Sequence, residues 1–161
     1  MPQFRTYDID SCAVFRRTDG QWGVFSNMAT GFPLLVNGIQ LCASEVLYQA
    51  CRYPNHPALQ EQLLLSETPL LAKMRSRAHV GKTRPDWSVV RISIMAWCLR
   101  IKLAQHYGSI TATLRLTGHQ QIVESSRDDD FWGATPSLDG MCLVGRNVLG
   151  RLWVMLRREV A

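Results

Sequence analysis

The chain has 161 residues, a length typical of one ordinary domain, and its 47% of hydrophobic residues are enough to bury one sizeable core. The 19% of charged residues exclude a disordered tail protein. No apolar run is long enough to cross a bilayer, and residues 1–10 lack the apolar region of a signal peptide. We therefore expect a cytoplasmic protein without a membrane partner.

The five cysteines and four histidines are scattered, without a C-x-x-C pair or zinc-ligand spacing. We interpret the cysteines as buried thiols of a reducing compartment. The sequence therefore predicts neither a metal site nor a bound cofactor.

The first predicted elements are short strands. Loosely alternating residues form an N-terminal strand region over 1–22, interrupted by a turn at Thr18–Gly20. Phe32–Leu41 reads as a hairpin around Asn37-Gly38, because a type I′ turn needs positive φ at both central residues. From Ser44, a candidate N-cap, the apolar period becomes that of a short helix through about Arg52.

The rest of the chain is mainly helical. Prolines in the first helical turn predict two helices, and the longest apolar period predicts a third that buries Val90, Ile94, Trp97 and Ile101. In order, the expected elements are helices over 57–66, 69–78 and 86–105, a shorter helix or turn over 111–116, a strand over 122–124, and a helix over 148–159. The sequence thus predicts an α+β fold, mainly helical with a small β-sheet, in a single domain over 1–161.

Four places hold residues that folding alone explains poorly. Glu45 lies in the first turn of a helix, where the helix dipole favours a carboxylate. Trp87 starts the long helix, either packed onto the core or offering a flat face to a heterocycle. Asp128–Asp130 precede Phe131–Gly133, as in a pocket wall or a solvated loop. Asn147 either caps the last helix or binds a sugar or phosphate, with free N–H groups beside it for an anion.

The formal net charge is +5, and basic residues gather in one stretch. This stretch is either a solvated surface or a phosphate cradle or rim that faces DNA. Its members are Lys73, Arg75, Arg77, Lys82, Arg84 and Arg91, with Asp86 as the one acid among them.

Over about 25–158 the chain resembles the NADAR, or YbiA-like, superfamily in the content and order of its motifs. The motifs are Phe25-Ser26-Asn27, Ser44-Glu45-x-x-Tyr48-Gln49-Ala50, Arg84-Pro85-Asp86-Trp87-x-x-Val90-Arg91-x-x-x-Met95, Thr117-Gly118, Val123-Glu124, Asp129-x-Phe131-Trp132-Gly133 and Asn147-x-Leu149-Gly150. The resemblance implies N-glycosidic activity. The family's activities are cleavage of early riboflavin-pathway intermediates and removal of ADP-ribose from guanine in nucleic acid, the latter as an antitoxin.

The resemblance also implies site residues. Glu45, Trp87 and Asp129 match the positions of the active centre, where two carboxylates and an aromatic ring suit an oxocarbenium-like transition state. A lysine imine to the ring-opened ribose is a second route, with Lys73 as the candidate. The expected substrate-binding residues are Asn27, Tyr48, Gln49, Arg84, Trp132, Gly133 and Asn147.

Departures from the riboflavin-type members favour a DNA substrate. After Gly133 the chain continues with Ala134-Thr135-Pro136 rather than a Gly-rich acidic turn, and segments 47–54 and 143–150 resemble the branch that accompanies DNA-modifying ADP-ribosyltransferase toxins. The expected ligand is therefore ADP-ribosylated DNA or another ADP-ribose-containing molecule, with such a toxin as functional partner. Hydrolysis of riboflavin intermediates and non-catalytic nucleotide binding remain as alternatives. A DNA-binding regulator fits less well, because the long helix is too apolar for recognition.

Overall fold

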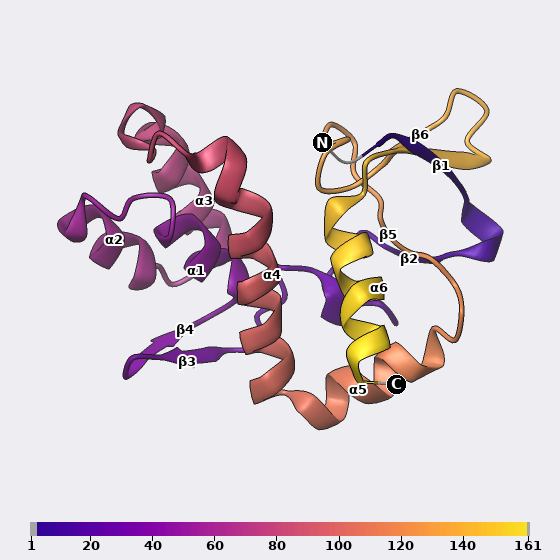
Figure 1. The fold of residues 1–161 in the computed structure, drawn as a ribbon, viewed down its shortest axis with the longest axis horizontal. Helices are drawn as coiled ribbons and strands as arrows, with labels where there is room; N and C mark the ends of the chain where they lie inside the picture. Colours follow the sequence, from indigo (N-terminus) through magenta and orange to yellow (C-terminus); the bar gives the residue numbers. More distant parts are fainter. Residues whose placement is uncertain (1–2, 161) are drawn as a thin grey trace. The chain divides into compact units, whose positions relative to one another are not determined.

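The computed structural model describes residues 3–160, which belong to two compact units (Figure 1). One unit combines the residues up to Ser26 with those from Gly108 onward, and the other is Asn27–Tyr107. The predicted α+β class with mainly helical content is confirmed, and the small sheet is in fact three small sheets. The single domain expected over 1–161 stays a prediction.

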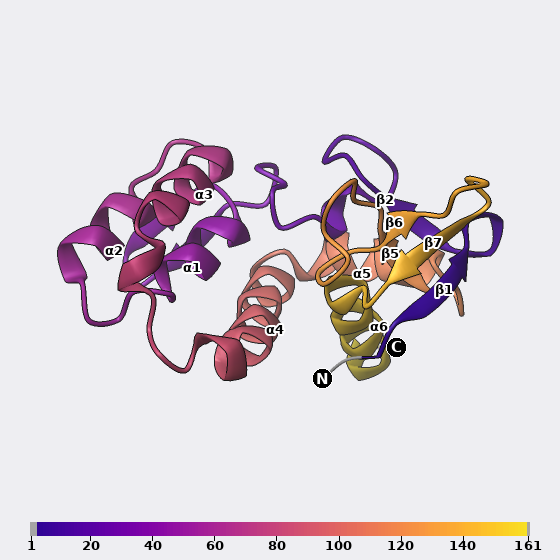
Figure 2. The same cartoon turned by 90° about the horizontal axis from the view of Figure 1, so that it is seen from above.

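The Asn27–Tyr107 unit consists of a hairpin and four α-helices (Figure 2). The predicted hairpin is confirmed, with φ of 51° at Asn37 and 80° at Gly38 between two antiparallel strands. The helices expected over 57–66 and 69–78 are confirmed, each with proline in its first turn. The elements are β3 (Leu34–Val36), β4 (Ile39–Leu41), α1 (Ser44–Ala50), α2 (Pro57–Leu64), α3 (Pro69–Ala78), the 3-10 helix η3 (Val80–Lys82) and α4 (Trp87–Gln105).

Helix α1 is the centre of this unit. All seven of its residues are buried, and it contacts α2, α3 and α4. Ser44 was expected as the N-cap, but Ala43 has that position and supplies no side-chain hydrogen bond. Ser44 belongs to the helix itself, and its hydroxyl donates to Asn27 instead.

The predicted buried face of α4 is wrong. Trp97 is 45% exposed, whereas Lys102 is completely buried. Apolar residues surround most of this helix, so the helical period fits more than one face, and packing against α1 and β3 selects the face actually buried. That face runs through Trp87, Met95, Cys98, Leu99 and Lys102.

The second unit consists of two small sheets and two α-helices. Strand β7 lies between β1 and β6 in an antiparallel sheet, and β2 pairs with β5 in parallel. Strands β6 and β7 were not predicted, because β6 has two residues and neither strand alternates clearly. The elements are β1 (Arg5–Asp8), η1 (Ile9–Ser11), β2 (Ala13–Phe15), η2 (Gly23–Phe25), α5 (Tyr107–Leu116), β5 (Ile122–Glu124), β6 (Thr135–Pro136), β7 (Cys142–Gly145) and α6 (Val148–Val160).

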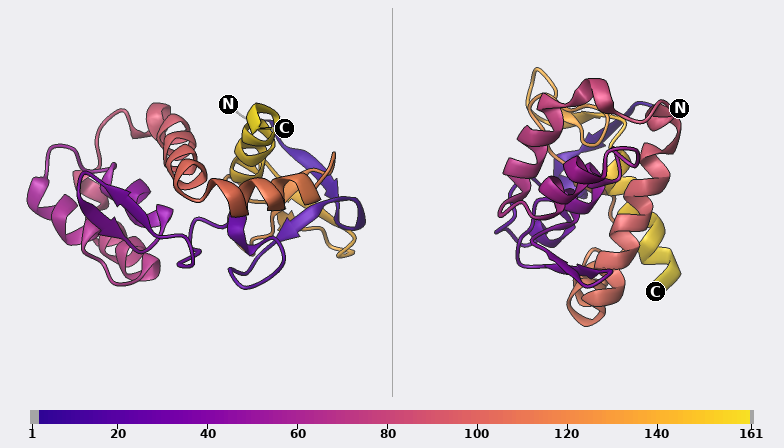
Figure 3. Two further views of the ribbon diagram at one scale, coloured as in Figure 1. Left: turned by 90° about the horizontal axis from the view of Figure 1, so that it is seen from below. Right: turned by 90° about the vertical axis from the view of Figure 1, so that its left-hand side faces the viewer.

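Helix α6 forms the core of the second unit. Trp153 is fully buried, lies 5.3 Å from the Phe25 ring and donates its indole N–H to Phe25 O at 2.8 Å. Gly150 lets α6 lie directly on β5, since a Cβ there would clash with Ile122 O. The C-terminal end of α6 lies beside α5 (Figure 1 and Figure 3).

Two sequence expectations concern the chain as a whole. Cys98 is buried, but the other four cysteines are only half-buried, so the description of all five as buried thiols is wrong. Over residues 3–160, every helix is too short or too polar to span a membrane.

Candidate functional site

Asn27 fixes the start of α1. Its carbonyl accepts the Glu45 N–H at 3.1 Å, its Oδ1 accepts the Ser44 hydroxyl at 3.3 Å, and its Nδ2 donates to Met95 Sδ at 2.8 Å. Asn27 is 5% exposed. It is thus a positioning residue that ties the N-terminus of α1 to α4, and its expected contact with substrate stays a prediction.

Glu45 is a buried and oriented carboxylate. It is 6% exposed, and its Oε1 accepts the side-chain N–H of Gln49, one helical turn away, at 2.8 Å. Glu45 lies in the first turn of α1, where the helix dipole favours negative charge. Glu45 therefore has the environment of a carboxylate that can hold a water molecule or a cationic sugar.

Trp87 packs between Tyr48 and Arg52. The Tyr48 and Trp87 rings are 5.1 Å apart at 47°, and the Arg52 guanidinium lies 5.3 Å from the Trp87 ring centre. Burial, with the nearby charge of Glu45, raises the pKa of Tyr48, so this hydroxyl stays protonated. Trp87 is 9% exposed, so in this structure it serves as a packing residue, and its contact with a base stays a prediction.

Buried polar atoms without a partner gather at the end of α1. Among residues 3–160, Gln49 Oε1, Arg52 Nε and Thr83 Oγ1 are buried and accept or donate no hydrogen bond. The Arg84 N–H donates to Arg52 O at 3.0 Å, so segment 83–84 lies against the end of α1. Since buried polar groups are nearly always bonded, a ligand or bound water is expected to complete this region.

The basic stretch does not form one free cationic surface. Arg84 makes a two-pronged ion pair with Asp86, at 2.6 and 2.8 Å, and this contact lowers the pKa of the Asp86 carboxyl. Arg75 donates to Gln62 O at 2.9 Å. Lys73 is half-buried on α3. Phosphate contacts by Arg84 and Lys73 stay predictions, and Arg84 would have to exchange its present partner.

Lys102 is a buried ionisable residue that was not predicted. Its Nζ lies 4.9 Å from the centre of the Phe32 ring, and burial lowers its pKa to about 7. An amine with this pKa is substantially neutral near physiological pH. The signal was present in the sequence, since Lys102 follows Met95, Cys98 and Leu99 at helical spacing.

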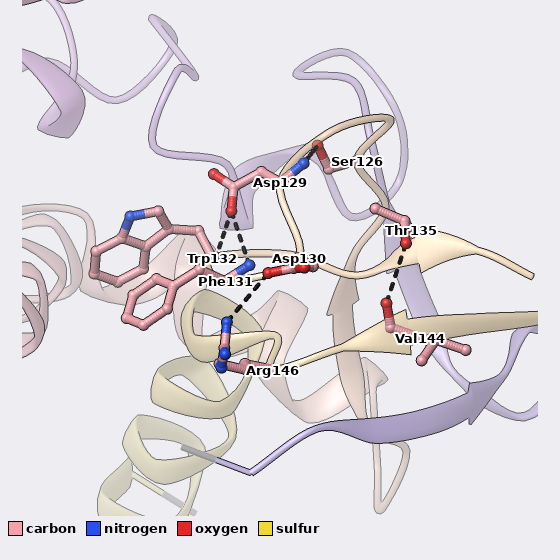
Figure 4. A network of polar contacts seen from close by, with 8 residues as sticks. All are labelled: Ser126, Asp129, Asp130, Phe131, Trp132, Thr135, Val144 and Arg146. Carbon is pink, nitrogen blue, oxygen red and sulfur yellow. Dashed lines mark hydrogen bonds and ion pairs between the residues drawn. The ribbon is translucent and has the colours of Figure 1, made fainter. Parts of the chain in front are cut away.

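In the second unit, Asp129 organises a tight loop (Figure 4). Its Oδ1 accepts the backbone N–H groups of Phe131 at 2.9 Å and Trp132 at 2.8 Å, and its own N–H donates to Ser126 Oγ at 3.0 Å. Hydrogen bonds from two amides fix the orientation of the carboxyl group. Asp129 is therefore suited to present its carboxyl group in one defined position.

The N–H groups at the start of α6 are not free for an anion, and that expectation is wrong. Carbonyls of the 130–133 loop accept the N–H groups of four consecutive residues from Arg146 to Leu149, at 2.7 to 3.0 Å. The pairs are Arg146 with Asp130, Asn147 with Gly133, Val148 with Phe131, and Leu149 with Trp132. The loop thus caps the helix and is held rigidly by it.

Asn147 and Gly133 serve the fold. Asn147 is completely buried with φ of 46°, accepts the Glu124 N–H at 3.1 Å and donates to Ile122 O at 2.8 Å, so both ends of its amide are used. At Gly133, a Cβ would lie 2.7 Å from Glu124 O. Their ligand contacts stay predictions.

The acids and aromatic residues of this loop have separate environments. Asp128 is exposed, and Asp130 pairs with Arg146 at 3.2 Å (Figure 4). Trp132 is half-buried, with its ring 5.1 Å from that of Phe131 at 86°. Trp132 is therefore more accessible than Trp87 as a stacking surface. Within the described residues, no group of three or more His, Cys, Asp or Glu could hold a metal ion.

Comparison with known proteins confirms the family resemblance. The model of the NADAR domain family matches residues 14–161. The Escherichia coli protein N-glycosidase YbiA is 30% identical over 152 residues, which covers 94% of this chain and 90% of that protein. The NMR structure of E. coli YbiA superimposes with a TM-score of 0.78 and 29% identity, and covers 93% of this chain and 84% of that one.

A riboflavin biosynthesis protein of Vibrio vulnificus is 34% identical over 127 residues, which is 79% of this chain but 33% of that longer protein. These relatives support an N-glycosidase of the NADAR type in general, without distinguishing its substrate.

Proposed function

The chain belongs to the NADAR family, and on this premise we propose that it is an N-glycosidase that removes ADP-ribose from guanine bases in DNA. It would reverse the modification made by a DNA ADP-ribosyltransferase toxin. The observation that carries the enzymatic part is Glu45, a buried carboxylate held by Gln49 beside polar atoms without partners. Such an arrangement is typical of a site completed by its substrate.

Glu45 would activate the attacking water. Cleavage of an N-glycoside passes through an oxocarbenium-like state, in which a new bond from water to the anomeric carbon replaces the bond to the base nitrogen. A carboxylate that orients the water and accepts its proton stabilises this state, while the departing base takes up a proton. The hydrogen bond from Gln49 fixes the orientation of the carboxylate for this role.

Asp129 would offset positive charge on the ribose. Its bonds to two backbone amides hold the carboxyl group in a fixed orientation. Trp132 would offer its half-buried ring to the leaving guanine. These two residues lie in one rigid loop, so they would act together.

Sequence features support DNA as the carrier of the substrate. The formal net charge is +5, and the Ala134-Thr135-Pro136 departure and segments 47–54 and 143–150 resemble the branch found with DNA-modifying toxins. A positive net charge attracts a polyanion and speeds its encounter.

A second candidate function is hydrolysis of early riboflavin-biosynthesis intermediates. The Vibrio vulnificus relative, named as a riboflavin biosynthesis protein, favours it. The same carboxylate chemistry applies, because these intermediates also join a ribose to a base nitrogen.

Direct comparison of the two substrates tests the proposal. The purified chain is incubated with guanine-ADP-ribosylated DNA and, separately, with a phosphorylated aminopyrimidine riboside, and released ADP-ribose or ribose phosphate is quantified. Faster release of ADP-ribose from DNA supports the proposal. Turnover of the riboside alone would assign the riboflavin function, and binding without turnover of either substrate would leave a non-catalytic nucleotide-binding module.

A further inference from the structure

A cavity of about 390 Å³ lies at the C-terminal ends of α5 and α6, within the unit that contains residues 108–161. Its apolar lining comes from Leu114 on α5 and from Val154 and Val160 on α6. Leu114 is fully buried and Val154 is 8% exposed, so the floor of the cavity is part of the packed core. The floor is therefore preformed rather than assembled by a ligand.

Three arginines line the same cavity. They are Arg115, at the end of α5, and Arg157 and Arg158, in the last turn of α6, and no acidic side chain is among the lining residues that the structure describes. Burial, with the charge of Arg158, lowers the pKa of Arg157. Cations gathered without a carboxylate repel one another, and an anion in the cavity would relieve that repulsion.

Arg157 is held in place in a way that leaves donors available. Its Nη1 donates to Thr117 Oγ1 at 2.6 Å and to Gln120 O at 2.9 Å. A guanidinium has five N–H donors, so the three on Nε and Nη2 remain, and within residues 3–160 they have no hydrogen-bond acceptor. The group is thus an oriented fork of the kind that binds phosphate in two-pronged fashion.

The size of the cavity indicates which anions fit it. A phosphate or sulfate ion alone would leave most of the 390 Å³ unfilled and would make no apolar contact with the floor. Pockets of roughly 300–1,000 Å³ with apolar walls and a few oriented polar groups are typical of small organic ligands. The combination fits an anion that carries a flat, largely apolar group.

We propose that this cavity is a nucleotide-binding site, in which Arg115, Arg157 and Arg158 bind the phosphate and the base packs against Val154 and Val160. The nucleotide is either free or part of a DNA strand, since both present the same chemistry. Helix α6 has 13 residues and is therefore about 20 Å long. The cavity at its C-terminal end is thus distinct from the Asp129 loop at its N-terminal end, and the proposal does not depend on the enzymatic function.

Resonances assigned to individual residues test the proposal in the intact ¹⁵N-labelled chain. Deoxyguanosine monophosphate, deoxyguanosine, inorganic phosphate and a short single-stranded oligonucleotide with a 5′-hydroxyl are titrated separately. The backbone signals of Gly118, His119 and Val160 report on the cavity, and those of Phe131 and Trp132 report on the Asp129 loop. The variant is Arg115→Glu combined with Arg158→Glu, both exposed positions, and Arg16→Glu in the same unit is the control for altered charge.

We expect deoxyguanosine monophosphate or the oligonucleotide to shift the cavity signals with a Kd at least about tenfold lower than that of deoxyguanosine or phosphate. The double variant should abolish these shifts, and Arg16→Glu should retain them. Tighter binding of the mononucleotide identifies a free nucleotide, and tighter binding of the oligonucleotide identifies a strand. Equal affinity for inorganic phosphate, shifts confined to the Asp129 loop, or undiminished binding by the double variant would overturn the proposal. In those cases the arginines would only offset the partial negative charge at the helix ends.

Discussion

The α1 region around Glu45 and the loop around Asp129 both present a carboxylate, but they differ in how many of their buried polar groups are hydrogen-bonded. Around Asp129, carbonyls of the loop accept the N–H groups from Arg146 to Leu149, and Asp129 itself accepts the N–H groups of Phe131 and Trp132. Around Glu45, Gln49 Oε1, Arg52 Nε and Thr83 Oγ1 are buried without partners among the described residues. The polar groups of the Asp129 loop are bonded within the chain, whereas the α1 region has hydrogen-bonding capacity left for a ligand or water.

This difference indicates that the α1 region binds a ligand and that the Asp129 loop holds its residues in position. Leaving a buried donor or acceptor unbonded costs roughly 1–3 kcal/mol, so a region that holds three such atoms is expected to gain stability when a ligand bonds to them. The Asp129 loop, in contrast, offers rigidity and a fixed charge. Substitutions should therefore affect turnover most strongly at Glu45 and stability most strongly around Asn147.

The largest expected effect is that of Glu45→Gln. The amide oxygen can still accept the Gln49 N–H, so the helix should keep its structure, but the proton acceptor is lost. We expect kcat for ADP-ribose release to fall by about 10²–10⁴ with an unchanged Tm. Glu61→Gln, at an exposed position on α2, is the matched control and should retain full activity. A Glu45→Gln enzyme with wild-type kcat would exclude Glu45 as the base.

Asp129→Asn should have the next largest effect on turnover. Asparagine can keep the bonds to the Phe131 and Trp132 amides through its oxygen, so the variant removes charge and preserves the loop. We expect kcat to fall by about 10², and Tm to stay within a few degrees of the wild type. Asp128→Asn, in the exposed neighbouring position, should change neither quantity. Equal losses in both variants would mean that only the summed charge of the loop matters.

Asn147→Ala should affect stability. It leaves the Glu124 N–H and Ile122 O without their partners, at a cost of about 2–4 kcal/mol in the free energy of unfolding. Urea denaturation measures this loss, with Asn55→Ala as an exposed control. If Asn147→Ala instead kept wild-type stability and raised KM, Asn147 would be a ligand-binding residue.

Lys102 gives a smaller effect that depends on pH. Its pKa is about 7 in the folded chain against an ordinary 10.5, so between these values the unfolded chain binds more protons. Stability should therefore rise with pH from about 7 to 10, by up to about 1.4 kcal/mol per pH unit. Lys102→Met should remove this slope in urea denaturation and Lys73→Met should retain it. If stability still rose with pH in Lys102→Met, another titrating group would have to cause the pH dependence.

The imine route is tested by trapping. If the ring-opened ribose forms an imine with a lysine, borohydride should reduce it and leave ADP-ribose bound to the chain, and the mass of the tryptic peptides identifies the lysine. We expect no trapped adduct, because Glu45 activates water. An adduct on Lys102 or Lys73 would replace the water mechanism.

The local elements could be predicted from sequence because their signals are local. Asn37-Gly38 encodes the hairpin turn, and the prolines at 57 and 69 mark helix starts. The buried face of α4 could not be predicted, since nearly all of its faces are apolar and only tertiary packing distinguishes Trp97 from Lys102.

Some site residues could likewise be predicted from sequence and others could not. The motifs led to Glu45 and Asp129, whose environments suit the expected roles. They did not reveal that the N–H groups from Arg146 to Leu149 already donate hydrogen bonds, because the acceptors lie in a loop some fifteen residues earlier in the chain. Motif position also cannot show whether Asn147 touches a ligand or the backbone of β5.

The most direct test is to locate ADP-ribose on the ¹⁵N-labelled chain. Saturating ADP-ribose should shift the side-chain signals of Gln49 and Arg52, because the ligand completes their hydrogen bonds. Unchanged Gln49 and Arg52 signals, with shifts confined to the Asp129 loop and the start of α6, would contradict the assignment of the binding region to α1.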